Sequence, residues 1–121
     1  MFPQEICVQF DPFKIVNNVS LTGCGIKKIV IHTCENDSAV NFVKQAEQAN
    51  VPNSNGLQSI KLDLKKNPRV KVMKIEVLEG YDEFFTIHTF GVLWKYEINV
   101  DEKKYLLYSN FILLFIINEI K

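Results

Sequence analysis

The sequence has no excess of charge of either sign. Its 14 Lys and Arg residues balance 14 Asp and Glu residues, so the formal net charge over 121 residues is zero. A neutral chain offers no strong field to attract nucleic acid or an anionic membrane surface, and we expect no nucleic-acid partner. Apolar residues make up 47% of the chain and charged residues 23%, which is ordinary for one globular domain with its own core.

Cysteine is scarce, and its spacing gives no disulfide framework. Cys7, Cys24 and Cys34 are odd in number and form no Cys-x-x-Cys motif. The amino terminus lacks the basic and apolar regions of a signal peptide, so we expect a reducing compartment inside the cell. The longest apolar stretch, Tyr105–Ile117, is shorter than the roughly 20 residues that a spanning helix needs, and we expect no membrane span.

No segment of ten residues carries a convincing helical pattern, whereas alternation with period two dominates. The alternation predicts strands with one buried face over residues 5–10, 26–33, 57–66, 70–77 and 84–100. A phase slip at Met73-Lys74 is typical of a β-bulge. Six or so strands at short spacing indicate an all-β fold, with an antiparallel β-sandwich or barrel as its architecture.

Two further segments are interpreted from their proline and polar residues. Asp11-Pro12 is expected to end the first strand, because Pro cannot donate a hydrogen bond to the ladder. Residues 40–43 predict a short strand, and the polar stretch Gln45–Asn50 predicts a loop.

The carboxyl-terminal segment differs in character from the rest. Residues 1–100 are expected to form the sandwich, and residues 101–121 a charged break followed by an apolar segment. Phe111–Ile117 is continuously apolar, whereas a half-exposed strand would alternate. This run is therefore either a fully buried added strand or an aggregation hazard, and a third alternative is a gene-model or splice-variant ending.

Residues that could carry catalysis or bind a metal form no known motif. His32 and Cys34 lie two apart on a predicted strand, with Cys24 upstream, which could supply metal ligands or a nucleophile. Their spacing matches no tight metal motif, and a free cysteine is commonly a small buried hydrophobic residue. His88 is expected in the core or at an edge.

The remaining candidates for chemistry also favour a structural interpretation. The acidic group over residues 76–83 could be read as paired carboxylates or cation ligands, but a solvated turn is the better interpretation. The chain has no glycine-rich phosphate loop and no Gly-x-Ser-x-Gly elbow. We therefore expect no enzyme, no catalytic residue, no metal site and no cofactor.

Aromatic residues make up 12% of the chain, and several gather between residues 84 and 96. Such rings can form a carbohydrate- or peptide-binding platform, but a sandwich core uses them as well, and the core is the favoured interpretation. Because partner surfaces have an apolar centre with aromatic anchors, we name four candidate partner-binding residues: Phe42, Tyr81, Phe84 and Trp94.

Three segments carry a resemblance to a known family. Met1–Phe10 contains Phe-Pro-Gln-Glu followed by an apolar strand, Ile26–His32 is a basic and apolar strand, and Val77–Thr89 has the form of closing strands. In this order, the sequence resembles the discoidin-type (galactose-binding-like) jelly-roll domains of ciliary proteins. That family includes the small subunit of the intraflagellar transport B complex and a ciliary-tip centrosomal protein.

The resemblance implies a non-enzymatic jelly-roll β-sandwich that works in the cilium or flagellum and the cytoplasm. In the transport complex the small subunit pairs with a Rab-like small GTPase, so the expected partners are that GTPase and other intraflagellar transport proteins. One alternative is a ciliary-tip or axonemal structural protein with the same jelly roll. A second is a module that binds a sugar or a lipid headgroup through loop tips such as Gly80–Asp82.

The sequence also departs from the family pattern. The family's calcium site lies in a loop upstream of the Phe-Pro-Gln-Glu strand, where this sequence has no residues, and we expect the family's first strands to be missing. Loss of opening strands leaves a sheet edge uncovered, which invites association. We hypothesise that Phe111–Ile117 folds back into the vacated position as a strand buried on both faces.

Overall fold

The computed structural model describes residues 2–36, 38, 40–53, 56–100 and 103–118, with backbone only for Pro12 and residues 95–118. These residues form seven strands: β1 (Gln4–Cys24), β2 (Ile26–Cys34), β3 (Val43–Gln48), β4 (Gln58–Asp63), β5 (Arg69–Gly80), β6 (Thr86–Val100) and β7 (Lys103–Asn118). All the strand pairs are antiparallel, and the described residues contain no helix. The predicted all-β fold class is confirmed.

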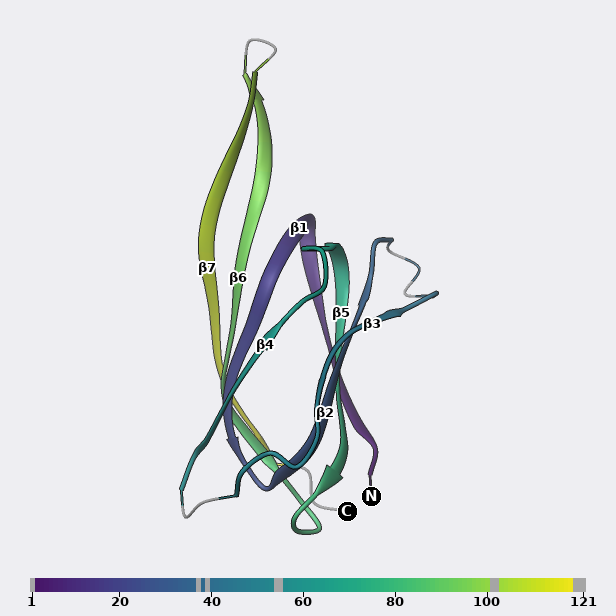
Figure 1. Cartoon of the computed structure of the whole chain (residues 1–121), viewed down its shortest axis with the longest axis vertical. Coiled ribbons are helices and arrows are strands. Elements are labelled where there is room, and N and C mark those ends of the chain that lie inside the picture. Colours follow the sequence, from purple (N-terminus) through teal and green to yellow (C-terminus); the bar gives the residue numbers. More distant parts are fainter. Residues whose placement is uncertain (1, 37, 39, 54–55, 101–102, 119–121) are drawn as a thin grey trace.

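β1 is long because it bends from one layer of the molecule into the other (Figure 1). Its first part, Gln4–Gln9, pairs with β5, whereas Asn18–Gly23 pairs with both β4 and β6. The first layer is therefore β3-β2-β5-β1, and the second is β4-β1-β6-β7. This curled antiparallel sheet is consistent with a β-sandwich of the jelly-roll type.

The expectation that Asp11-Pro12 ends the first strand is wrong. The pairing of β1 with β5 passes directly from Gln9 to Lys14, and these two residues face Val72 and Val70, which are only two positions apart. The intervening residues of β1 form an irregularity where the strand bends, so Pro12 occupies a position at which a bulge replaces regular pairing. The strand therefore continues through the proline.

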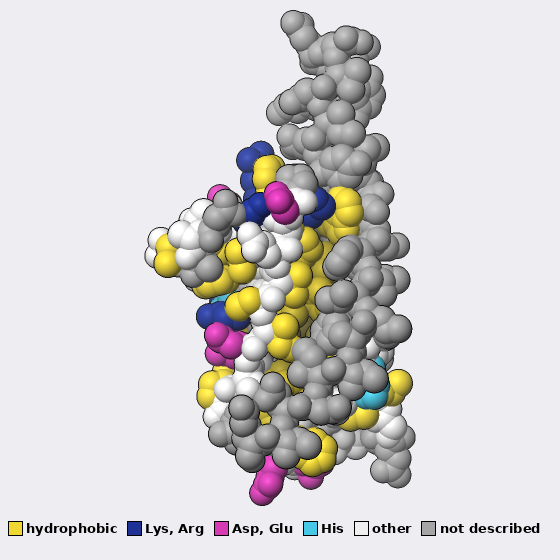
Figure 2. Space-filling model, turned by 180° about the vertical axis from the view of Figure 1, so that it is seen from behind, with side chains coloured by type: hydrophobic (Ala, Val, Ile, Leu, Met, Phe, Trp, Pro, Cys, Tyr) yellow, Lys and Arg dark blue, Asp and Glu magenta, His cyan; other side chains and the backbone are white. Residues whose placement is uncertain are grey.

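The core lies between the two layers. Ile29, Ile31 and Ile75 come from the first layer and Leu21 and Phe90 from the second, and each is at most 2% exposed. Burial of a large apolar side chain contributes about 1.5–3 kcal/mol, so this shared interior is the main term that holds the layers together. On the face seen in Figure 2, hydrophobic side chains also reach the surface in a band along the long axis.

A bulge in β6 allows the strand to keep apolar residues inside on both sides of an irregularity. Gly23 and Thr22 of β1 face Ile87 and Thr89, which leaves His88 as the additional residue of β6. Inward positions change phase at this point, from Phe85 and Ile87 to Phe90 and Val92. The alternation predicted for the later part of β6 is found in Phe90 and Val92.

Two local predictions need correction. Gln45–Gln48 belongs to β3, so the loop predicted over Gln45–Asn50 is wrong there; Gln45 is buried and its amide donates to the Thr33 hydroxyl at 3.0 Å. The predicted bulge at Met73-Lys74 is also misplaced. Pairing of β5 with β1 is regular from Val72 to Val77, and the irregularity lies in β1, opposite residues 70–72. The alternation in β5 changes phase beside this irregularity, because its partner strand β1 bends at that point.

β7 runs alongside β6 for most of its length. Phe111 faces Val92 and Ile117 faces Ile87, on the opposite side of β6 from β1. Pairing of β6 with β1 stops at Lys95, so the rest of β6 pairs with β7 alone as a two-stranded arm (Figure 1). Residues 101–102 and 119–121 lie outside the described residues, and the division into segments 1–100 and 101–121 stays a prediction.

Candidate interaction surfaces

Three connections meet at one end of the sandwich and place apolar side chains in solvent. The Gly25 carbonyl accepts a hydrogen bond from the Tyr81 amide at 3.0 Å, and the Tyr81 hydroxyl donates to the Val51 carbonyl at 2.6 Å. Gly25 has a φ of 79°, and a Cβ there would lie 2.9 Å from the Phe84 carbonyl oxygen. Glycine at this position therefore allows the β1–β2 connection to approach the β5–β6 connection closely.

We call the exposed apolar residues at this end, Leu57, Tyr81 and Phe84, the loop-end surface. Their exposed fractions are 56%, 38% and 49%. Leu57 follows Gly56, whose carbonyl accepts a weak hydrogen bond from the Cys24 thiol at 3.7 Å. The Lys27 ammonium lies 5.8 Å from the centre of the Tyr81 ring, which adds a cation beside the aromatic side chain. An apolar centre with a polar border is the usual form of a partner surface.

Of the four predicted partner-binding residues, the structure places Tyr81 and Phe84 in one connection and the other two elsewhere. Phe42 precedes β3, and the Lys74 ammonium lies 4.6 Å from its ring centre. Trp94 lies in β6, is partly buried and packs against the core, with the Lys14 ammonium 4.9 Å from its ring centre. The assignment of all four as contact residues stays a prediction.

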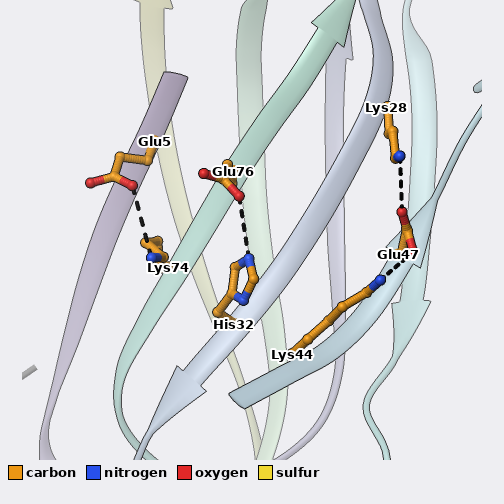
Figure 3. A network of polar contacts seen from close by, with 7 residues as sticks. All are labelled: Glu5, Lys28, His32, Lys44, Glu47, Lys74 and Glu76. Carbon is orange, nitrogen blue, oxygen red and sulfur yellow. Dashed lines mark hydrogen bonds and ion pairs between the residues drawn. The ribbon is translucent and has the colours of Figure 1, made fainter. Parts of the chain in front are cut away.

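The outer face of the first layer carries a network of charged and polar side chains (Figure 3), which Phe42 borders through its contact with Lys74. One row across this face contains Glu5 in β1, Glu76 in β5 and Glu47 in β3. The next row contains Lys74 in β5, His32 in β2 and Lys44 in β3. Acidic side chains meet basic ones diagonally between the rows, since Lys74 lies 4.0 Å from Glu5 and the His32 ring lies 3.3 Å from Glu76.

The contact between Lys74 and Glu5 offsets part of the repulsion between the neighbouring carboxylates of Glu5 and Glu76. Glu47 contacts both Lys44 and Lys28, the latter at 3.3 Å. These hydrogen bonds, first that of Lys44 and then that of Lys28, hold the pKa of the Glu47 carboxyl below its usual value. This face therefore carries its own counter-charges, which makes it a solvated surface and a poor apolar docking site.

Trp94 lines a cavity of about 400 Å³ beside the first part of β1. Its other lining residues come from β1 and include Val8, Phe10 and Lys14. Ile6 and Val8 are partly exposed, although both direct their side chains toward the core. The cavity therefore marks a side of the sandwich where the interior is incompletely covered.

The thiols and imidazoles that the sequence suggested as ligands do not come together. His32 contacts Glu76, the Cys34 thiol donates to the Val40 carbonyl at 3.0 Å, and Cys24 lies near neither. Cys24 lies instead 3.9 Å from His88, whose ring also meets the Thr86 hydroxyl at 3.0 Å. Sequence reasoning missed this pair because the two residues are 64 positions apart and meet only through β1–β6 pairing.

The other chemical candidates are solvent-facing. Asp82 and Glu83 lie in the β5–β6 connection and are exposed, as expected for a solvated turn, whereas Glu76 and Glu79 belong to β5, so the turn interpretation is wrong for these two. Within the described residues, no group of three or more His, Cys, Asp or Glu side chains is arranged to hold a metal ion. The same part of the chain contains no helix with the length and hydrophobicity that a membrane crossing requires.

A comparison with known proteins adds information that the geometry does not carry. No protein-family profile matches the sequence. The sequence is similar to intraflagellar transport protein 25 of Chlamydomonas reinhardtii. The two are 26% identical over 93 residues, which is 77% of this chain and 48% of the relative, so the chain spans about half of that protein's length. This distant similarity supports a relationship to intraflagellar transport proteins.

Proposed function

We propose that the chain is a non-enzymatic interaction subunit of the intraflagellar transport machinery in cilia or flagella. The observation that carries this proposal is the similarity to intraflagellar transport protein 25 along 77% of the chain. The all-β architecture fits a subunit of this kind, because such a sandwich presents broad surfaces and loop ends to partners. Fold alone would not specify the role, since sandwiches serve many functions.

The proposed partners are a Rab-like small GTPase and other intraflagellar transport proteins, as the family resemblance implies. The loop-end surface is the proposed contact region for the GTPase. Phe84 and Tyr81 supply exposed aromatic groups there, and large aromatic side chains contribute most of the binding energy at many interfaces. Leu57 adds aliphatic area from a different connection, so the surface is wider than one loop.

Co-expression with the Rab-like transport GTPase of the same organism, followed by size-exclusion chromatography, tests the proposal. We expect a stoichiometric complex that co-elutes, and we expect Phe84→Ala to weaken it at least tenfold. Phe13→Ala is the matched control, because Phe13 is a 42% exposed aromatic residue at the bend of β1, close to the first residue of β5. Tyr81 and Phe84 follow the last residue of that strand.

Three results would contradict the proposal in different ways. Separate elution of a folded chain would argue against the GTPase as partner and favour a ciliary-tip or axonemal structural role. Equal loss of binding in Phe84→Ala and Phe13→Ala would leave the GTPase as a partner but would show that the loop-end surface is not its specific contact region. Binding of glycans or of liposomes by the chain alone would instead favour the headgroup-binding alternative.

A further inference from the structure

Basic side chains gather at the end of the sandwich where β1 bends, opposite the loop-end surface. Arg69 is the first residue of β5, whereas the connection that carries Tyr81 follows the last residue of that strand. Lys65, Lys66 and Arg69 are exposed at this end, and none of them forms an ion pair within the described residues. We call these three residues the bend-end patch. Figure 2 shows dark blue Lys and Arg side chains gathered at this end of the molecule.

The turn between β4 and β5 is hydrogen-bonded to β1 on both of its sides. The Leu64 amide donates to the Asn17 carbonyl, and the Val16 amide donates to the Pro68 carbonyl, each at 3.0 Å. Because the two β1 residues are adjacent, the chain has to reverse its direction within this turn. The patch therefore keeps its three cations close together, although two come from the turn and one from the strand that follows it.

The backbone of the turn does not favour a lysine at its tip. Lys66 has a φ of 56° and Asn67 has a φ of 42°, so both lie in the left-handed region. Asparagine adopts this region readily, whereas lysine meets a steric cost from its Cβ that glycine would avoid. The side chain therefore accounts for the lysine at this position, and what that side chain supplies is an ammonium group without an acidic partner.

An aromatic ring positions the third cation of the patch. The guanidinium carbon of Arg69 lies 5.2 Å from the centre of the Phe13 ring, and the ring face attracts the planar cation. Stacking of this kind leaves N–H groups at the guanidinium edge available, and that edge matches a carboxylate through two parallel hydrogen bonds. The patch therefore combines one oriented bidentate donor with two ammonium groups.

The acidic side chains at this end do not neutralise the patch. Asp11 lies 3.1 Å from the Lys71 ammonium and so already has a cation, and its side chain is 90% exposed. Glu35 lines a cavity of about 240 Å³ together with Arg69, but the two form no ion pair among the described side chains. Although the net charge of the whole chain is zero, this end carries unmatched positive charge.

The layout of the patch favours a peptide as its ligand. Lys65 and Lys66 lie outside the cavity that Arg69 lines, so the three cations do not converge on one multiply charged group such as phosphate. A lipid bilayer or a nucleic-acid duplex would cover the whole end, and its phosphates would be repelled by the exposed Asp11 and Glu35. A short chain with successive carboxylates can contact the three cations alone. We propose that the bend-end patch binds a short acidic segment of a partner polypeptide.

A second copy of the chain fits the patch less well. The exposed acids toward its loop end, Glu79, Asp82 and Glu83, are accompanied by two lysines. Lys28 faces Glu79 in the register between β2 and β5, and Lys27 precedes it in β2. A head-to-tail dimer would bring these lysines toward the cations of the patch, and this repulsion would offset part of the attraction.

The patch and the loop-end surface are separate. Gln4 pairs with Val77 and Asn118 pairs with Thr86, so both of these residues lie toward the loop end and far from the patch. A chain that holds the proposed GTPase at the loop end would still present the patch at its other end. Together with the proposed function, the patch would therefore make this chain a link between two partners.

The first test measures binding of a defined acidic peptide. A tetramethylrhodamine-labelled peptide of six glutamates is titrated into the purified full chain at low ionic strength, and fluorescence anisotropy reports binding. We expect saturable binding that the double substitution Lys65→Gln and Lys66→Gln weakens about fivefold, the effect of losing two exposed ion pairs. Lys27→Gln with Lys28→Gln is the matched control, because it removes an adjacent pair of lysines near the opposite end. A peptide of six glutamines should not bind.

The second test separates charge from folding. Lys66→Gly removes one cation and relieves the left-handed backbone, so we expect its urea midpoint to equal or exceed that of the unsubstituted chain. We also expect it to weaken binding of the glutamate peptide about twofold. Lys66→Arg keeps the charge and should bind the peptide as the unsubstituted chain does. Equal binding by Lys66→Gly and Lys66→Arg would overturn the proposal.

NMR spectra of the unsubstituted chain supply a readout that needs no variant. The glutamate peptide should shift the amide signals of residues 64–69, and shifts confined to other parts of the chain would overturn the proposal. Phosphatidylserine vesicles and a DNA duplex are tested alongside the peptide. Tighter binding of either, weakened by the double substitution, would assign the patch to a membrane or to nucleic acid and would also overturn it.

Sedimentation velocity of the chain alone tests the remaining occupant. Self-association that the double substitution abolishes would assign the patch to a second copy and would equally overturn the proposal, whereas a monomer at all concentrations supports it. None of these readouts involves the GTPase, so the bend-end patch and the loop-end surface can fail independently.

Discussion

Phe84 and Phe85 are neighbours in the sequence but lie in opposite environments. Substituting each one in turn therefore distinguishes a surface residue from a core residue. Phe84 is 49% exposed, whereas Phe85 is 1% exposed and its ring centre lies 5.8 Å from that of Phe2. We expect Phe85→Ala to lower the free energy of unfolding by about 3–5 kcal/mol through loss of burial and cavity formation.

Phe84→Ala should change that free energy by less than about 0.5 kcal/mol, because it removes an exposed ring. Urea unfolding followed by circular dichroism measures both values. A destabilisation by Phe84→Ala comparable with that of Phe85→Ala would show that Phe84 belongs to the core, and the loop-end surface would then lose its main aromatic residue.

Glu47 provides the pH dependence that the structure supports. Its pKa is lowered from 4.5 in the folded chain by hydrogen bonds from Lys44 and Lys28. A carboxyl whose folded pKa lies below its unfolded pKa stabilises the fold above about pH 4.5, and that contribution is lost as the pH falls through the lowered folded value. We expect Glu47→Gln to reduce the urea midpoint at pH 7, with a difference that shrinks toward zero at pH 3.

The exposure of this carboxyl limits the effect to a small one, since solvent screens the ion pairs. Glu83→Gln is a suitable control, because Glu83 is also exposed and lies in the β5–β6 connection. A Glu47→Gln difference that persists unchanged at pH 3 would contradict the assignment of these pairs as the source of the pKa shift.

At the scale of the strands, alternation predicted the elements that have one buried and one solvated face. β4 shows this most clearly, since its burial alternates along Gln58–Asp63 as the sequence indicates. β3 could not be predicted in the same way, because its buried member is the polar Gln45, which is satisfied by a hydrogen bond to Thr33. The full length of β1 could not be predicted for a different reason, since the bend allows a proline to lie within the strand.

β7 gives the clearest test at this scale. It pairs with β6 on the side opposite β1, where Phe111–Ile117 faces the stretch from Ile87 to Val92. Our hypothesis that this apolar run occupies the position vacated by the missing opening strands stays a prediction, and it implies that deletion of residues 105–121 converts a soluble chain into aggregate and lowers its resistance to urea. A chain ending at Asn118 is the control, because it retains all of β7. Equal solubility and equal urea resistance of the truncated chain would refute the hypothesis.

At the scale of the whole molecule, the fold class follows from the sequence and the arrangement of surfaces does not. The turn chemistry at Gly80-Tyr81-Asp82 was sufficient to predict a loop tip at Tyr81, whereas Phe84, which the alternation placed in a strand over residues 84–100, precedes the first residue of β6. The position of Phe42 beside Lys74 depends on the register among β5, β2 and β3, which single-strand patterns do not specify. The pairing of Glu5–Gln9 with β5 alone among the described strands also emerges only from the register, because a strand's own alternation is the same at an edge and at the centre.

The central claim is that this chain travels as part of the intraflagellar transport machinery. The most direct measurement is live imaging of the fluorescently tagged full chain in flagella of Chlamydomonas reinhardtii that lack their own intraflagellar transport protein 25. Our account predicts bidirectional tracks that coincide with a second labelled transport protein. A signal that stays at the tip, remains bound to the static axoneme or diffuses freely in the flagellum would contradict it.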